Sequence, residues 1–198
     1  MHSFSEEIQA SVMLQELKRK CETLGIFPAE HSLVASIARQ RMWHFRGDKL
    51  VAEYKISTSR AEPSCIENSL GTPDGLFAVC EKIGADAPAG TVFKARKSTG
   101  LHFSEFLKNA PTENLITSRI LRLDGLENGH NRGGNCDTLA RFIYIHGTNC
   151  EDRLGTPNSH GCILLGNKDI IELFDALPPQ SATNQNGKPC ALLLVSRN

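Results

Sequence analysis

The sequence has no apolar run long enough for a membrane-spanning helix. Such a helix needs about 20 consecutive apolar residues, and no segment reaches that length. The first 20 residues also lack a basic stretch followed by an apolar core, so no secretory signal is expected in the chain as given. Positive charge is not in excess, because 22 Lys and Arg balance 22 Asp and Glu. The composition therefore argues against a nucleic-acid partner, which would require a basic surface.

Closely spaced cysteine pairs are absent too. The chain has seven cysteines but no C-x-x-C motif, which argues against a zinc ribbon or a thioredoxin-like site. Seven is odd, so at least one cysteine is unpaired, and the scattered spacing is typical of free thiols in a reducing compartment. We expect neither a metal nor another cofactor. The cysteines are Cys21, Cys65, Cys80, Cys136, Cys150, Cys162 and Cys190.

The first 40 residues have a helical pattern. Ser3 and Glu6 have the spacing of a capping box. Gly25 is expected to end a first helix and Pro28 to open a second one, which would include residues 29–40. We interpret residues 1–40 as an N-terminal helical segment packed on the flank of the domain. Apolar residues that recur at steps of three and four define one face of the first helix: Leu14, Leu17, Cys21 and Leu24.

From residue 41 the pattern changes to short strands. Residues 41–57 predict a β-hairpin with Gly47 and Asp48 in its turn. Further strands are expected in residues 75–83, 91–96, 115–123, 138–146 and 190–196, and one helix in residues 167–177, which Pro178 ends. Many short strands and few helices predict a mainly β domain, similar to a sandwich or barrel, over residues 41–198. Its helix has an apolar face made of Ile170, Leu173, Phe174 and Leu177.

A histidine and a cysteine lie at two positions that are expected at the edge of the sheet. Phe142, Tyr144 and His146 alternate along one face of the expected strand, and His146 ends it. Ser159-His160-Gly161-Cys162 directly precedes the apolar run at residues 163–165. An imidazole can take the proton of a nearby thiol and so produce a nucleophile. His146 is one candidate for this base, and His160 is another. Gly161 would leave room for a substrate carbonyl and for backbone N–H donors around it.

The residue types alone leave other interpretations open. A single cysteine is usually an inert, buried thiol, and a histidine on an apolar strand is often a core residue. A metal site made of His146, Cys150, His160 and Cys162 would not match the usual structural zinc spacings.

The wider pattern resembles a known family. The string H-G-T … S-H-G-C-I, followed by L-x-N-x-D-I-x-x-L-F, resembles the signature of the YkuD-type L,D-transpeptidases, cysteine enzymes that cross-link peptidoglycan. The segment NSLGTPDGLFAV is similar to the T-P-x-G-x-F hairpin of that family, and the resemblance extends over residues 41–198. It implies a YkuD-type catalytic domain with a short N-terminal helical segment.

The resemblance implies roles for individual residues. Cys162 would be the nucleophile, His146 the general base, and the carbonyl of Gly147 would orient His146. The N–H groups of Gly161 and Cys162 would form the oxyanion hole. Many relatives have an arginine where this chain has Leu164, so anchoring of a substrate carboxylate at that position is in question. The remaining residues expected to shape the pocket or contact substrate are His160, Ser159, Thr148, Tyr144 and Arg141.

The implied reaction is acyl transfer from a peptidoglycan tetrapeptide stem through a thioester on Cys162. An amine of a second stem would then give a 3→3 cross-link. Water as acceptor would make the protein an L,D-carboxypeptidase or amide hydrolase, and a lipoprotein lysine would make it an anchoring enzyme. An alternative of another class is a peptidoglycan-binding module without turnover. The resemblance implies the periplasm or cell envelope, while the chain as given leaves the cytoplasm open.

Overall fold

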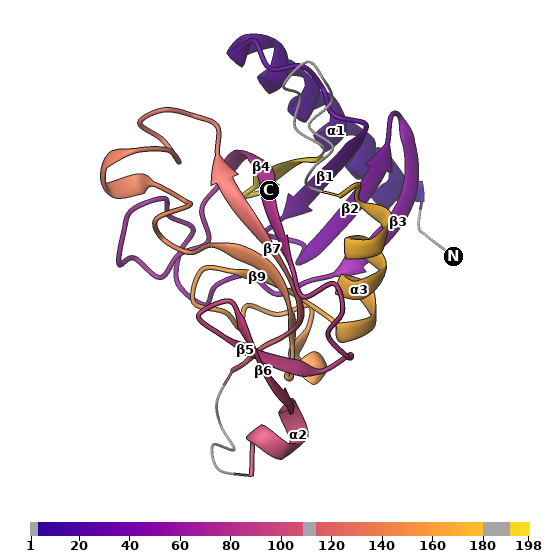
Figure 1. Cartoon of the computed structure of the whole chain (residues 1–198). Helices are drawn as coiled ribbons and strands as arrows, with labels where there is room; N and C mark the ends of the chain where they lie inside the picture. The colour runs from indigo at the N-terminus through magenta and orange to yellow at the C-terminus, as the bar shows by residue number, and fades with distance from the viewer. Residues whose placement is uncertain (1–3, 109–113, 180–190) are drawn as a thin grey trace.

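Most of the chain folds around one curved β-sheet. The computed structural model describes residues 4–108, 114–179 and 191–198. These residues contain ten strands and three α-helices (Figure 1). The helices are α1 (Phe4–Leu24), α2 (Phe103–Phe106) and α3 (Asn167–Ala176). The strands are β1 (His31–Ser36), β2 (Arg41–Arg46), β3 (Lys49–Lys55), β4 (Gly75–Ile83), β5 (Thr91–Lys94), β6 (Lys97–His102), β7 (Ile116–Gly125), β8 (Tyr144–Thr148), β9 (Ile163–Leu165) and β10 (Ala191–Ser196).

The strands follow the order β3-β2-β1-β10-β4-β7-β5-β6, and β8 and β9 branch from β7. Two pairs are parallel, β1 with β10 and β8 with β9, and the others are antiparallel. Strand β7 is long enough to pair with β4 along one part and with β5 and β8 along another. It therefore connects the central sheet to the β8–β9 branch, which carries the predicted site.

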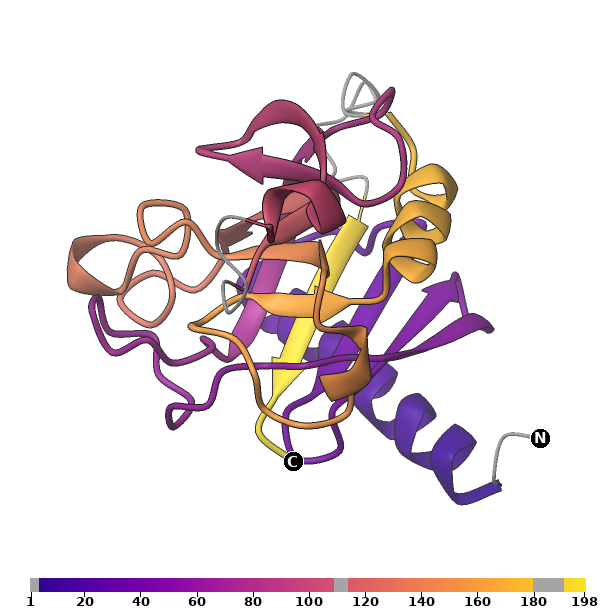
Figure 2. The same cartoon turned by 90° about the horizontal axis from the view of Figure 1, so that it is seen from below.

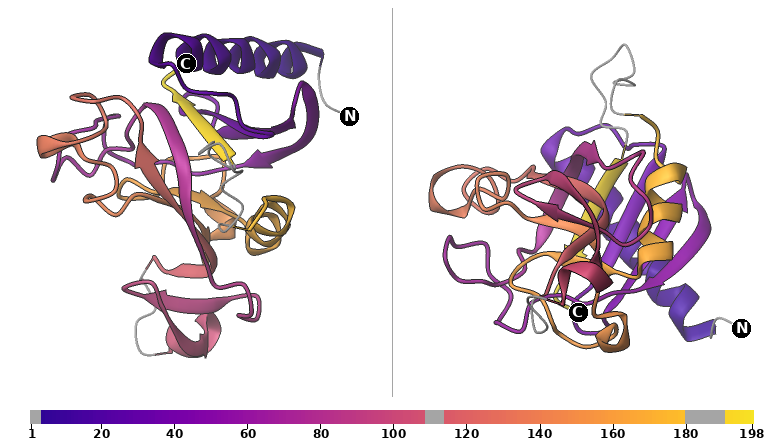
Figure 3. Two further views of the ribbon diagram at one scale, coloured as in Figure 1. Left: turned by 45° about the horizontal axis from the view of Figure 1, so that its top comes forward. Right: turned by 60° about the horizontal axis from the view of Figure 1, so that its bottom comes forward.

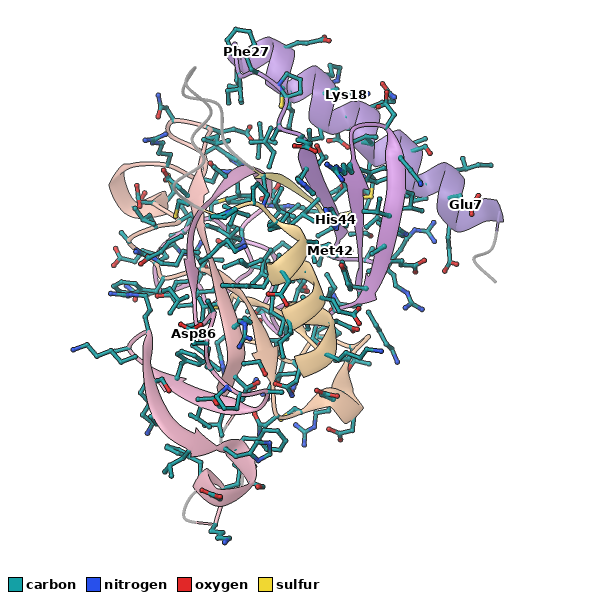
Figure 4. All side chains as sticks on the ribbon, turned by 45° about the vertical axis from the view of Figure 1, so that its right-hand side comes forward. Glu7, Lys18, Phe27, Met42, His44 and Asp86 are labelled. Atoms are coloured by element: carbon teal, nitrogen blue, oxygen red, sulfur yellow. The ribbon has the colours of Figure 1, made fainter. Side chains whose placement is uncertain are left out.

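The sheet is covered on both faces (Figure 3). Along β10, Leu192 and Leu194 face α1, whereas Leu193 and Val195 face α3 and the β8–β9 branch. This alternation follows from the two-residue period of a strand. Figure 4 labels Lys18 on α1 and Met42 on β2, and Met42 belongs to the core on the α3 side. Each large apolar side chain buried in these cores stabilises the fold by about 1.5–3 kcal/mol.

Several predictions from local patterns are confirmed. The mainly β fold, the β2–β3 hairpin and helix α3 are present, and the four apolar residues predicted for this helix are buried, although Leu177 lies just after its end. Helix α1 buries Leu14, Leu17 and Cys21 against the sheet and ends before Gly25, but Leu24 is 39% exposed. The capping interaction of Ser3 and the strand position of Cys190 lie outside the described residues. None of the described helices is long and apolar enough to cross a membrane.

The prediction of a second N-terminal helix is wrong. Residues 31–36 form β1, which lies between β2 and β10 and is buried on both faces. Pairing with two neighbours overrides the local preference of alanine and leucine for a helix. The predicted boundary at residue 40 falls in the turn between β1 and β2.

The strand before the site begins later than predicted. Residues 138–142 form turns, and β8 begins at Tyr144 and continues through Gly147 to Thr148. Phe142 has a left-handed backbone with φ of 57° and is 55% exposed, so it does not share the face of Tyr144 and His146. The local apolar pattern missed this turn because hydrogen bonds such as Arg141 N–H to the Asp137 carbonyl stabilise it. The prediction also missed β6, β9 and α2.

Candidate active site on strands β8 and β9

The parallel pairing of β8 with β9 brings the predicted residues together. Ile145 pairs with Ile163 and His146 with Leu164. Both isoleucines face the core under α3. Side chains alternate along strands, so His146 and Cys162 share the opposite face. The Tyr144 N–H donates to the Cys162 sulfur at 3.4 Å. The thiol therefore lies beside Tyr144, which is two residues before His146 on β8.

His146 is held as a neutral base. Its side chain is only 4% exposed, and Nδ1 lies 2.8 Å from the carbonyl oxygen of Gly147. A carbonyl oxygen can only accept, so Nδ1 carries the proton and the lone pair of Nε2 remains available. Burial lowers the pKa of His146 from 6.5 to about 4, so the ring is uncharged at neutral pH.

The Cys162 thiol is also neutral in this structure. It packs beside an apolar cluster of Phe93, Ile120 and Tyr144. Burial raises the pKa of the thiol from 9.0 to about 11, although the Tyr144 N–H and the charge of Arg141 act in the opposite direction. The thiol donates to the carbonyl of Phe142, with sulfur and oxygen 3.7 Å apart.

The two groups are therefore neighbours without a direct bond. Among the hydrogen bonds of the described residues, none joins His146 to Cys162. The thiol proton is directed at the Phe142 carbonyl, and the Nε2 lone pair of His146 is not used within the described chain. Hydrogen bonds of catalytic pairs are often formed only when substrate binds. The arrangement suits proton transfer at the moment of attack and disfavours a preformed thiolate.

Gly147 is required by a close approach of β7. A Cβ added to Gly147 would lie 2.6 Å from the carbonyl oxygen of Thr117. The register of β7 against β8 shifts between Thr117 and Ile120, and Ser118 there has a φ of 63°. Asn167, at the start of α3, accepts from the hydroxyls of Thr117 and Ser118 at 2.7 and 2.5 Å and donates to the Thr148 carbonyl at 2.9 Å. Asn167 thus ties β7 to the end of β8, a position for which the sequence analysis gave no role.

The turn before Cys162 is built by Ser159 and Gly161. Ser159 is 3% exposed, and its hydroxyl donates to the Cys162 carbonyl at 2.6 Å. Gly161 has a φ of 128°, and a Cβ there would lie 3.0 Å from Ile143, so a larger residue would be strained. The Gly161 N–H donates to the Ser159 hydroxyl at 3.2 Å. This predicted oxyanion donor is therefore engaged within the turn in the structure.

A pocket of about 260 Å³ opens beside this turn. Its lining includes exposed His160 and the half-buried Arg141. Arg141 donates to the carbonyls of Ser64 and Gly71 at 3.0 and 2.8 Å, so these carbonyls already engage its guanidinium. The complete lining is Glu67, Asn68, Leu70, Ala140, Arg141, Phe142, Ile143 and His160.

The other residues predicted to contact substrate are buried. Tyr144 is 5% exposed and Thr148 is fully buried, with its hydroxyl 3.3 Å from the side-chain oxygen of Asn114. The Tyr144 hydroxyl accepts from Arg96 at 3.1 Å, and the same guanidinium lies over the Phe142 ring at 5.3 Å. Arg96 lies in the turn between β5 and β6, far from the motif in sequence, and no local pattern marks it.

Leu164 is an interior residue in this chain. It is 1% exposed, pairs with His146, and exchanges two backbone hydrogen bonds with Ser57 at 3.0 and 2.8 Å. Its side chain therefore excludes water beside the imidazole. Arg96 and Arg141, which lie on other segments of the chain, bring cationic groups to this region.

Comparison with known proteins gives a family match. The family model YkuD, described as the L,D-transpeptidase catalytic domain, matches residues 30–184. No curated protein matches the chain.

Solved structures with a similar chain path include several bacterial L,D-transpeptidases. The enzyme from Mycobacterium smegmatis is 17% identical, with a TM-score of 0.48, and the alignment covers 85% of this chain and 59% of that one. A C442S mutant from Enterococcus faecium is 16% identical, with a TM-score of 0.49 and coverages of 84% and 50%. L,D-transpeptidase 3 from Mycobacterium tuberculosis is 15% identical, with a TM-score of 0.49 and coverages of 84% and 61%. The chain thus spans between half and about three fifths of the length of these proteins.

Proposed function

Because the family model matches residues 30–184, the chain belongs to the family of YkuD-type L,D-transpeptidase catalytic domains, and on this premise we propose that it is a cysteine acyltransferase. Its donor would be the tetrapeptide stem of peptidoglycan, and its site of action the periplasm or cell envelope. The observation that carries the proposal is the pairing of β8 with β9, which puts Cys162 and His146 on one face of the sheet.

The first step is acylation of the thiol. The sulfur of Cys162 attacks the carbonyl carbon at the meso-diamino acid of the stem, and its proton passes to Nε2 of His146. The C–S bond forms, and collapse of the tetrahedral intermediate breaks the amide C–N bond. His146 returns the proton to the departing amine of D-alanine, which leaves a thioester on Cys162.

The second step resolves the thioester. An amine of a second stem attacks the acyl carbon, His146 accepts a proton from it, and the sulfur leaves as the new amide forms. The proton then returns to the sulfur, so the thiol is regenerated. The Nδ1–H bond to Gly147 supports both steps, because a fixed carbonyl stabilises the imidazolium that exists transiently.

Two conformational adjustments are required for this chemistry. The S–H bond must turn from the Phe142 carbonyl toward His146, which rotation about the Cβ–Sγ bond of Cys162 can supply. The Gly161 N–H must exchange the Ser159 hydroxyl, at 3.2 Å, for the developing oxyanion. The Gly161 bond lies at the long end of the ordinary range, and the Cys162 bond has a weak S–H donor, so their loss costs little.

A stem carboxylate would need a cation other than residue 164. Arg96 lies beside Tyr144 and Phe142, which both contact Cys162 through their backbones. Arg141 donates to backbone carbonyls, whereas within the described residues Arg96 donates one hydrogen bond, to the Tyr144 hydroxyl. We therefore assign the carboxylate contact to Arg96 and an electrostatic and positioning role to Arg141.

Incubation with tetrapeptide-bearing muropeptides tests the proposal. Cross-linked dimers would identify transpeptidation, tripeptides would identify L,D-carboxypeptidase activity, and coupling to a lysine peptide would identify anchoring. Cys162→Ala should abolish every product, while Cys80→Ala, which removes a partly buried thiol of β4, should keep them. Unchanged turnover in Cys162→Ala would refute the catalytic mechanism, and no turnover by the parent chain would favour a binding module. A carbapenem adduct on Cys162, detected by mass spectrometry, provides an independent readout.

A further inference from the structure

A second group of chemically reactive side chains lies outside the site on β8 and β9. Cys65 is in the segment between β3 and β4, Asp74 directly precedes β4, and His130 is in the segment between β7 and β8. The Cys65 sulfur lies 3.6 Å from Oδ1 of Asp74 and 3.7 Å from Nε2 of His130. Nε2 of His130 in turn lies 3.7 Å from Oδ1 of Asp74. The three atoms form a nearly equilateral triangle.

The size of this triangle matches a tetrahedral metal site. Three ligands on a tetrahedral zinc ion, at about 2.0–2.3 Å from it, lie about 3.3–3.8 Å from one another. The sides of the observed triangle are 3.6–3.7 Å, so a point about 0.75 Å above its plane lies about 2.2 Å from each atom at tetrahedral angles. A zinc ion therefore fits between the three atoms with little movement of the side chains.

The same geometry argues against a catalytic triad. In a triad, one ring nitrogen of the histidine faces the nucleophile and the other faces the carboxylate. Here a single nitrogen, Nε2 of His130, faces both the sulfur and the carboxylate oxygen. Atoms that converge on one point in this way are arranged as ligands.

The carboxylate is oriented by a further residue. Nε and Nη2 of Arg197 lie 3.1 Å from Oδ2 and Oδ1 of Asp74, respectively. This fork fixes the plane of the Asp74 carboxylate. Partners that orient metal ligands in this way strengthen metal sites. A divalent cation would be neutralised by one thiolate and one carboxylate, which leaves the single charge of Arg197 at the rim.

We propose that Cys65, Asp74 and His130 form a binding site for a zinc-type divalent cation, with the fourth position open to water. Thiolate and imidazole ligands favour zinc over magnesium or calcium. The His130 side chain is 44% exposed, which gives the ion a path from solvent. Binding would release the thiol proton of Cys65. The cysteine spacing did not predict this site, because Cys65 is 65 residues from His130.

The site would connect the two segments that line the pocket. Residues 56–74 and 126–143 lie side by side, at the left of both Figure 1 and Figure 2. A backbone hydrogen bond of 2.7 Å from Glu67 to Asn135 already joins them. The first segment supplies Glu67 and Leu70 to the pocket, and the second supplies Arg141. A bound ion would therefore order the pocket without contacting the reacting atoms.

Metal analysis of the full chain tests the proposal. After equilibration with Zn²⁺ and removal of free ion, about one equivalent should remain. His130→Ala and Cys65→Ser should each lose it, and Arg197→Gln should weaken binding by about 10–100-fold, as expected for a residue that orients a ligand. Cys136→Ser is the matched control, since it alters a buried thiol of the same segment as His130. Cobalt substitution should give a thiolate-to-metal charge-transfer band that disappears in Cys65→Ser.

The result is separable from the proposed enzymatic activity. Cys162→Ala should retain the zinc even though it loses turnover. Retention of less than a tenth of an equivalent by the parent chain, or binding that survives in both Cys65→Ser and His130→Ala, would overturn the proposal. Loss of zinc in Cys162→Ala would also overturn it, because the ion would then occupy the catalytic pair. Because His130 is exposed, its substitution tests binding without disturbing the core.

Discussion

The protonation state of Cys162 gives a quantitative prediction. Its thiol is desolvated beside Phe93 and Ile120, and its pKa is raised to about 11. His146, whose pKa is lowered to about 4, is neutral and makes no hydrogen bond to the thiol within the described residues. We expect alkylation of Cys162 by iodoacetamide to be slow at neutral pH and to rise about tenfold per pH unit up to about pH 11.

The expected magnitude follows from the thiolate fraction. At pH 7 a thiol with a pKa of about 11 is ionised to about one part in 10,000, whereas a free thiol with a pKa of about 8.5 is ionised to about 3%. The ratio is about 300-fold, but a thiolate of higher pKa is more nucleophilic, with a Brønsted slope of about 0.4–0.5. Cys162 should therefore react about 20-fold more slowly than free cysteine. Any steric protection would slow it further.

The assay is quantitative mass spectrometry of the Cys162 peptide over a series of reaction times between pH 6 and pH 10. His146→Gln is the informative variant. Without a preformed ion pair, its alkylation profile should stay close to that of the parent chain. Its turnover of a stem peptide should fall by about 100-fold or more, because the general base is lost. Together the two measurements separate proton transfer during attack from a thiolate that exists beforehand.

A rate plateau between pH 6 and pH 9 would refute this reasoning. Such a plateau would mean that Cys162 is already a thiolate, paired with a protonated His146. In that case His146→Gln would abolish the plateau and slow alkylation at neutral pH. A fast, pH-independent reaction in the parent chain would therefore contradict both the neutral thiol and the neutral imidazole.

Three further perturbations follow from the same structure. Gly147→Ala would force a Cβ to within 2.6 Å of the Thr117 carbonyl. The substitution should therefore lower the free energy of unfolding by about 1–3 kcal/mol, measured by denaturant titration, and reduce turnover, measured by product analysis. Unchanged values would contradict the close approach. Burial and the neighbouring His31 lower the pKa of His44 from 6.5 to about 4. The folded state therefore keeps its full stability above pH 6.5 and loses up to about 3 kcal/mol of it as the pH falls to 4, because the unfolded chain binds the proton first. Unfolding titrations across this range should show a shallower pH dependence for His44→Gln, and an equal slope would contradict this prediction. Arg96→Gln should raise KM for a stem peptide about tenfold with a smaller effect on kcat. Arg96→Lys should have a smaller increase in KM, because the positive charge is kept. An unchanged KM in Arg96→Gln would mean that another residue contacts the carboxylate.

His44 illustrates the difference between local and tertiary information. Figure 4 shows it on β2, and its Nε2 lies 2.9 Å from Nδ1 of His31 on β1. The hairpin that contains His44 was predictable from alternation and from the Gly47 turn. The strand that carries His31 was not, because its six residues are buried on both faces and their order resembles that of a helix. Only pairing with β2 and β10 selects the strand.

The candidate site likewise contains residues that local patterns identify and residues whose role depends on the tertiary structure. The motif around Cys162 and His146 could be identified from the sequence, because a thiol, histidines and glycines stand in a characteristic order and spacing. Ser159, Thr148 and Tyr144 were predicted to shape the pocket or to contact substrate, and the structure buries all three. Their side chains bond or pack within the fold, which composition and spacing do not reveal.

The sequence by itself determined helix α1, the β2–β3 hairpin and helix α3, and it indicated Cys162 and His146 as candidates for catalytic chemistry. These depend on periodicity and turn residues, whose interactions extend over only a few positions of the chain. The tertiary structure alone decided the strand character of residues 31–36, the face shared by His146 and Cys162, the approach of Arg96 and the convergence of Cys65, Asp74 and His130. Each of these joins residues far apart along the chain, so it depends on which strands pair and in which register.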